Sequence, residues 1–130
     1  MAGTIVANTI NTDTGVFSTN NAYTGIVKAW VDFTNSGTIN ASFNVSSVTV
    51  NGTGDYTINF ASALSNANYI TMATTQCDTG SLNNGTGFFG MRSTNGTPTT
   101  KTTTTARMLT SAVNGSLYSS PVNSVAFIGS

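Results

Sequence analysis

The stretch Ile26-Val27-Lys28-Ala29-Trp30-Val31-Asp32-Phe33 decides the fold. Successive side chains of a β-strand point to opposite faces, so every second residue lies on the same side. One face therefore holds Val27, Ala29, Val31 and Phe33, and the other holds Ile26, Lys28, Trp30 and Asp32. The first set is entirely apolar, which predicts a strand that packs this face into a core.

The same alternation recurs along the rest of the chain, between turn residues at short intervals. After Asn35-Ser36-Gly37, a second strand is expected to place Ile39, Ala41, Phe43 and Val45 on its core face. Further strands are expected over Val48–Val50, Tyr56–Phe60, Tyr69–Gln76, Phe88–Met91, Thr99–Leu109 and Val122–Ile128. About eight short strands in residues 26–130 predict an antiparallel β-sandwich, jelly-roll-like, with a β-barrel as the alternative.

The composition favours a folded, self-associating chain. Thr (25), Asn (16) and Ser (15) make up much of the 130 residues, only 6% are charged, and the net charge is zero. A chain that is 38% hydrophobic with no net charge does not have the composition of a disordered protein. Copies of such a chain do not repel one another, and nothing steers it toward nucleic acid or an anionic membrane.

Catalysis and metal binding are not expected, because the chain has no His and no Glu. Its four carboxylates, Asp13, Asp32, Asp55 and Asp78, are widely spaced, and no cofactor is predicted. The segment Gly85–Gly90 matches G-x-G-x-x-G, but no helix is expected to follow it, so a glycine-rich turn is favoured. Cys77 is alone and is interpreted as a small buried hydrophobic residue. No membrane span or secretory signal is recognised, and a soluble protein is expected.

Residues 1–25 differ from the rest and are predicted to form an extended N-terminal arm, with no hairpin partner at tight-turn distance. Its β-branched residues suit strand addition to a neighbouring subunit or scaffold. The candidate interface residues in this arm are Ile5, Val6, Ile10, Val16 and Phe17. A frayed terminus is the alternative.

Trp30 and Ile26 are candidate interface residues of the sandwich domain, because they lie opposite the predicted core face of their strand. An amphipathic aromatic at that position suits a subunit interface. A strand buried on both sides is an equally good interpretation.

Two polar loops are candidate recognition sites, over residues 77–87 and 95–104. The candidate residues in them are Asp78, Asn83, Asn84, Asn95, Thr97 and Lys101. The Thr-rich segment Thr97–Thr105 is interpreted as a strand whose threonines pair with neighbouring strands, and an outward row that binds glycan or ice is the alternative.

Residues 25–70 resemble a recurrent module of tailed-phage virion proteins. The resemblance rests on the ordered blocks KAWV-F (from Lys28), SFNVSSV (from Ser42), NGTGDYT-NF (from Asn51) and AL--ANY (from Ala63). This pattern is similar to those of tail-fibre and other virion surface proteins, especially of marine and cyanobacterial phages. The N-terminal residues 3–12 are similar to segments in the same group, whereas residues 71–130 are divergent.

The resemblance implies a non-enzymatic, β-rich component of the virion, assembled in the host cytoplasm as a homotrimer. A short arm before one compact domain favours a capsid decoration (cement) protein, whose partners are its own copies and the major capsid protein or another virion protein. The alternative is a tail-fibre or spike module that recognises a host surface glycan or protein.

Overall fold

A computed structural model of the chain describes residues 9–12, 15–18, 25–76, 88–91, 101–112 and 115–129. All regular elements in these ranges are β-strands. The strands are β1 (Thr9–Thr12), β2 (Gly15–Ser18), β3 (Val27–Thr34), β4 (Ile39–Phe43), β5 (Val45–Gly52), β6 (Asp55–Phe60), β7 (Ile70–Thr75), β8 (Phe88–Met91), β9 (Thr105–Ser111) and β10 (Val122–Ile128).

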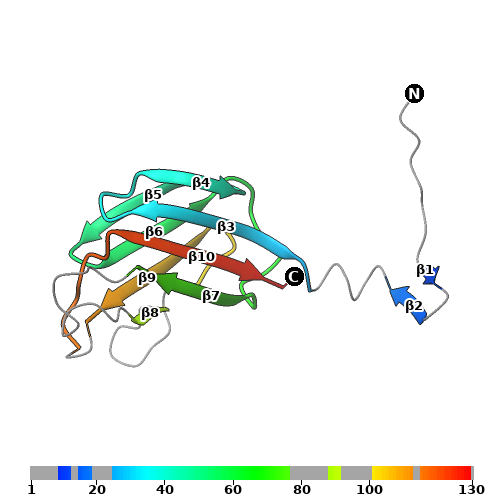
Figure 1. Ribbon diagram of the computed structural model, residues 1–130. Helices are drawn as coiled ribbons and strands as arrows, with labels where there is room; N and C mark the ends of the chain where they lie inside the picture. Colours follow the sequence, from blue (N-terminus) through cyan, green and yellow to red (C-terminus); the bar gives the residue numbers. More distant parts are fainter. Residues whose placement is uncertain are drawn as a thin grey trace.

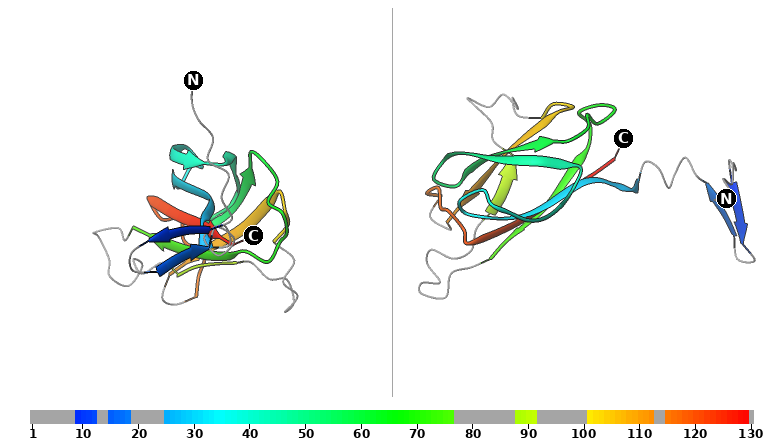
Figure 2. Two further views of the ribbon diagram at one scale, coloured as in Figure 1. Left: turned by 90° about the vertical axis from the view of Figure 1, so that its right-hand side faces the viewer. Right: turned by 90° about the horizontal axis from the view of Figure 1, so that it is seen from above.

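Strands β3 to β10 form two four-stranded antiparallel sheets, with the orders β4-β3-β10-β7 and β5-β6-β9-β8. The sheets pack against each other as two layers, as Figure 1 and Figure 2 show from three directions. The first and last strands of this unit, β3 and β10, are paired at the centre of one sheet. The predicted antiparallel β-sandwich is therefore confirmed.

The core between the sheets is rich in aromatic rings that meet edge to face. The ring of Phe127 on β10 lies 5.0 Å from that of Phe60 on β6 and 5.5 Å from that of Tyr69, between centroids. Tyr69 is fully buried, and its hydroxyl hydrogen is shared between the carbonyls of Thr102 and Thr105, at 3.2 Å each. Buried Tyr hydroxyls need such partners, and these contacts attach the start of β9 to the core.

The predicted core face of β3 is confirmed for three of its four residues. Ala29, Val31 and Phe33 are at most 1% exposed, and Phe33 meets the ring of Tyr56 at 5.1 Å between centroids. Val27 is half-buried at the end of the strand.

The prediction of one continuous strand from Ile39 to Val45 with a single core face is wrong. Ile39 is half-buried and Val45 is buried, but Ala41 and Phe43 are exposed. A register shift between Asp32 and Phe33 changes which residues of β4 face the core. The chain then leaves this sheet at Asn44, whose φ of 53° is left-handed, and continues as β5 in the other sheet.

The predicted strand from Thr99 to Leu109 is too long, because β9 begins only at Thr105. The hydroxyl of Thr102 accepts from the backbone N–H groups of Thr104 and Thr105, at 3.1 and 2.8 Å. A threonine side chain that bonds the backbone in this way stabilises a turn in place of a strand. A regular outward threonine row is therefore not formed over residues 102–104.

The expectation that the N-terminal arm has no hairpin partner at tight-turn distance is also wrong. β1 pairs with β2 in an antiparallel two-stranded sheet, with Thr9 opposite Ser18 and Thr12 opposite Gly15. Only two residues separate the strands, which is the length of a tight hairpin loop.

Candidate functional site

The candidate site is the outer face of the β4-β3-β10-β7 sheet, where one row of residues in register crosses all four strands. Phe43 pairs with Trp30, Trp30 with Ala126, and Ala126 with Met72. The side chains of Phe43, Trp30 and Met72 are 55%, 39% and 61% exposed. The next row along the strands adds Ile70, which pairs with Ile128 and is 60% exposed. We call Trp30, Phe43, Ile70 and Met72 the apolar patch.

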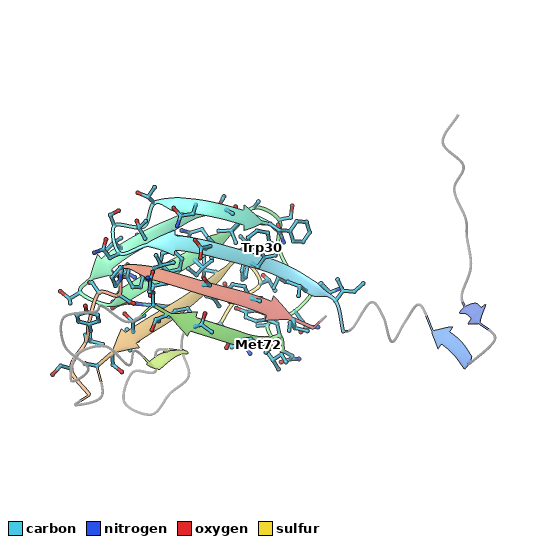
Figure 3. All side chains as sticks on the ribbon, viewed as in Figure 1. Trp30 and Met72 are labelled. Atoms are coloured by element: carbon cyan, nitrogen blue, oxygen red, sulfur yellow. The ribbon has the colours of Figure 1, made fainter. Side chains whose placement is uncertain are left out.

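A groove runs along β10 within this patch. Its volume is about 410 Å³, and its walls carry Trp30 from β3 and Met72 from β7. Figure 3 shows these two side chains on the strands that flank β10. The groove exists because β10 contributes only the small side chains of Ser124 and Ala126 between two strands with large ones.

One end of the groove is polar, and Asp32 is its charged group. Ser124 Oγ donates to Asp32 Oδ2 at 2.6 Å, and Asn40 Nδ2 donates to Asp32 Oδ1 at 2.7 Å. These two hydrogen bonds hold the pKa of the Asp32 carboxyl below its ordinary value of 3.8, with the bond from Ser124 the larger cause. Asp32 is therefore ionised at neutral pH and its charge is satisfied within the sheet.

The outer face of the other sheet has a different character, because short polar side chains bond to one another across its strands. Asn59 Nδ2 donates to Ser47 Oγ and Thr49 Oγ1, at 3.0 and 3.1 Å. Asn51 Nδ2 donates to Thr57 Oγ1 at 2.9 Å. The two outer faces of the sandwich thus differ: one carries the apolar patch and the groove, and the other is covered mostly by polar side chains.

Another charged contact is an ion pair at the start of β6. Arg107 Nε and Nη2 donate to Asp55 Oδ1 and Oδ2, each at 2.8 Å, in a two-pronged contact. The hydrogen bonds with Asp55 raise the pKa of the Arg107 guanidinium further. Asp55 is 6% exposed, so this pair anchors β9 to β6.

Of the residues singled out from the sequence, Trp30 lies in the apolar patch and is exposed, which excludes a strand buried on both sides. Ile26, 51% exposed, directly precedes β3. Lys101 contacts the core: its ammonium donates to the carbonyl of Tyr69 and lies 4.6 Å from the centre of the Tyr69 ring.

Three of the remaining candidates are brought together in the β1-β2 sheet: Ile10 on β1 is the cross-strand partner of Phe17 on β2, and Val16 is the neighbour of Phe17. The candidates Ile5, Val6, Asp78, Asn83, Asn84, Asn95 and Thr97 lie outside the described residues, as does Cys77.

Sequence reasoning missed Phe43, Ile70 and Met72. Phe43 was expected in the core, and the shift in register that turns it outward has no signal in the alternation. On β7 the residues that alternate with Ile70 and Met72 are Thr71, Ala73 and Thr75, which are half-buried. The larger apolar side chains of β7 therefore point outward, against the usual pattern of an amphipathic strand.

The described residues contain no group of three or more His, Cys, Asp or Glu that could hold a metal ion. No helix among these residues is long and apolar enough to cross a membrane. What the outer face of the β4-β3-β10-β7 sheet offers chemically is apolar contact area with a shaped groove.

Comparisons with protein-family models, with curated proteins and with solved structures found no match for this chain.

Proposed function

We propose that this protein is a non-enzymatic structural component of a tailed-phage virion, a homotrimeric decoration protein that coats and stabilises the head. The observation that carries the proposal is the two-sided sandwich, with an apolar patch on one outer face and a polar network on the other, in which the charges of Arg107 and Asp55 are paired. A subunit of a coat needs both kinds of surface, because one must be covered by neighbours and one must face water.

The resemblance of residues 25–70 to virion surface proteins supports the same assignment. Its first three blocks fall on β3, β4, β5 and β6, two strands of each sheet, and the fourth lies in the connection between β6 and β7. Under this proposal the N-terminal residues 1–25 attach the subunit to the major capsid protein or another virion protein, and strand addition is the mode of contact.

The deciding experiment is the copy number of this chain in purified virions relative to the major capsid protein, by quantitative mass spectrometry with cryo-EM localisation. A count comparable to that of the capsid protein, with density over the head, is the expected result. A few trimers per particle at the tail would replace decoration by a tail-fibre or spike module that recognises a host surface glycan or protein. Absence from the particle would overturn the virion assignment altogether.

A second experiment tests the role of the arm. Deleting residues 1–20 should abolish binding to particles while the remaining chain stays folded and trimeric. The measurement is cosedimentation of the added protein with particles that lack it, together with circular dichroism and light scattering. A shortened chain that still binds particles would show that attachment lies elsewhere.

A further inference from the structure

We propose that the apolar patch is the interface between copies, and that the groove over Ala126 of one copy receives projecting side chains from the apolar patch of the next. This names the surface that holds the proposed homotrimer together, and so it rests on the self-association in the proposed function. It is independent of where on a virion the protein sits.

The concentration of apolar side chains is the first reason. The described residues expose seven large hydrophobic side chains, and four of them, Trp30, Phe43, Ile70 and Met72, lie on this one sheet face. Single exposed hydrophobic residues are normal on a monomer, but a contiguous group on one sheet marks an interaction surface.

The shape of the face is the second reason. Trp30 and Met72 stand on strands on either side of β10, which places them about 10 Å apart, two strand spacings. The space between them over Ala126 admits one row of side chains from an opposing sheet, which is how the inner faces of packed sheets interdigitate. Because the face carries both projecting side chains and a groove, the projections of one copy can enter the groove of the next, and such a head-to-tail contact can close into a ring of three.

The charge of the face favours a second copy over a charged partner. The face carries one charge of each sign on β3, Lys28 and Asp32. Asp32 is the one charged residue in the groove lining, and its two oxygens already accept from Ser124 and Asn40. The chain as a whole has zero net charge, so two copies meet without repulsion.

The size of the face sets the strength expected. Four strands and the seven residues of β10 give a face of roughly 450 Å² in projection, or about 900 Å² for two copies. That is below the range of about 1,200 to 2,000 Å² for stable interfaces, so a pair held by this face alone is weak. A closed ring in which each copy contacts two others buries more, and the association should depend on protein concentration.

Trp30 makes the test direct, because it is the only tryptophan of the chain. Fluorescence of the full-length protein should shift to shorter wavelength, and acrylamide quenching should fall, as concentration rises. Light scattering over the same series should show the mass rising from 13.4 kDa toward three times that value. Association while Trp30 stays fully quenchable would overturn the proposed interface but leave self-association intact. A chain that is monomeric throughout would overturn both.

Two variants with a matched control test the contact itself. Met72→Lys should raise the dissociation constant at least tenfold, because it places a charge in the contact. Leu117→Lys makes the same kind of change at an exposed hydrophobic residue outside the two sheets and should leave association unchanged. Equal effects of the two variants would contradict a specific interface.

Ala126→Leu distinguishes a shape-dependent contact, in which side chains enter the groove, from nonspecific apolar association. It adds apolar surface but fills the groove, so a shape-dependent contact is weakened about tenfold, whereas a nonspecific apolar contact is strengthened. Circular dichroism confirms that each variant is folded. Stronger association of Ala126→Leu would overturn the groove as the receiving site. The protein could fail these tests and still be present in virions at the expected copy number. That result would keep the proposed function and reject only the apolar patch as the interface between copies.

Discussion

Ser124 and Asp32 face each other across the two central strands of the β4-β3-β10-β7 sheet, joined by a hydrogen bond of 2.6 Å. The bond closes the polar end of the groove and keeps a carboxylate beside an apolar patch without leaving it unsatisfied. A hydrogen bond to a charged acceptor is stronger than one between neutral groups, so this contact fixes the position of Asp32.

Ser124→Ala should raise the pKa of Asp32 toward 3.8, because it removes the larger of the two bonds that lower it. Since the folded-state pKa is depressed, the contribution of Asp32 to stability is present above pH 3.8 and is lost as the pH falls through the folded-state value. NMR titration of the Asp32 carboxyl carbon measures the shift. Asn40→Ala is the matched control and should raise the pKa less, so an unchanged titration in Ser124→Ala would contradict this account.

Asn44→Ala should lower the free energy of unfolding by about 3 kcal/mol. The variant loses the hydrogen bonds of the Asn44 side chain, and alanine is strained in the left-handed conformation of this residue. Asn44 Nδ2 donates to the carbonyls of Lys28 and Ser62, at 3.1 and 3.2 Å, and its Oδ1 accepts from the Ser62 N–H at 2.8 Å. Asn44→Gly loses the same bonds but accepts the φ of 53° without strain, so it should cost about 1 kcal/mol less. Urea denaturation measures both. Equal costs would show that the backbone conformation contributes nothing.

Gly54→Ala should be among the most damaging single changes, at about 3 kcal/mol or more. Gly54 has a φ of 63°, and a Cβ there would lie 2.5 Å from the carbonyl oxygen of Thr110 and 2.7 Å from that of Tyr118. Gly52, in the same Asn-Gly-Thr-Gly turn, has no atom within 4 Å of such a Cβ, so Gly52→Ala is the control and should be nearly neutral. Thermal unfolding of the two variants measures the difference in their stability. Equal stability would show that the turn moves away from β9 and makes room for the added methyl group.

Tyr69 should make the protein sensitive to alkali. Burial raises the pKa of its hydroxyl to about 12 from an ordinary 10.0. Because the folded-state pKa is raised, the contribution of Tyr69 to stability is complete below pH 10 and is lost as the pH rises through about 12. Tyr69→Phe should be less stable at pH 7, through loss of the hydroxyl's hydrogen bonding to Thr102 and Thr105, but its stability should fall less between pH 10 and 12. Parallel pH dependence of the two proteins would contradict this.

How far the sequence predicts the fold can be seen by comparing β3 with β4. The alternation in β3 correctly predicts which residues enter the core, because a regular strand keeps its parity along its whole length. In β4 the same reasoning fails for Phe43, since a register shift and the left-handed Asn44 change the parity. The register shift lies in the pairing of β4 with β3, and Asn44 is held by contacts with the distant residues Lys28 and Ser62, neither of which a local pattern records.

The candidate site was only partly predictable for a related reason. Trp30 could be identified as an outward residue because its own strand has a clear core face. Met72 could not, because β7 packs small side chains inward against the large rings of the core and leaves its bulkier residues outside. The alternation of residues shows which side chains of β7 share a face. It does not show which face turns inward, because that depends on the space available beside Phe127 and Tyr69.

The network of Asn and Thr side chains on the β5-β6-β9 face has a consequence for how an assembled coat would behave in solution. With the apolar patch covered, water would meet a surface of amides and hydroxyls on which the charges of Arg107 and Asp55 are paired, and such a surface attracts few counterions. Particles coated in this way would stay dispersed through hydration and not through mutual repulsion. Their colloidal stability should therefore change little with ionic strength, from dilute buffer to the salt concentration of seawater.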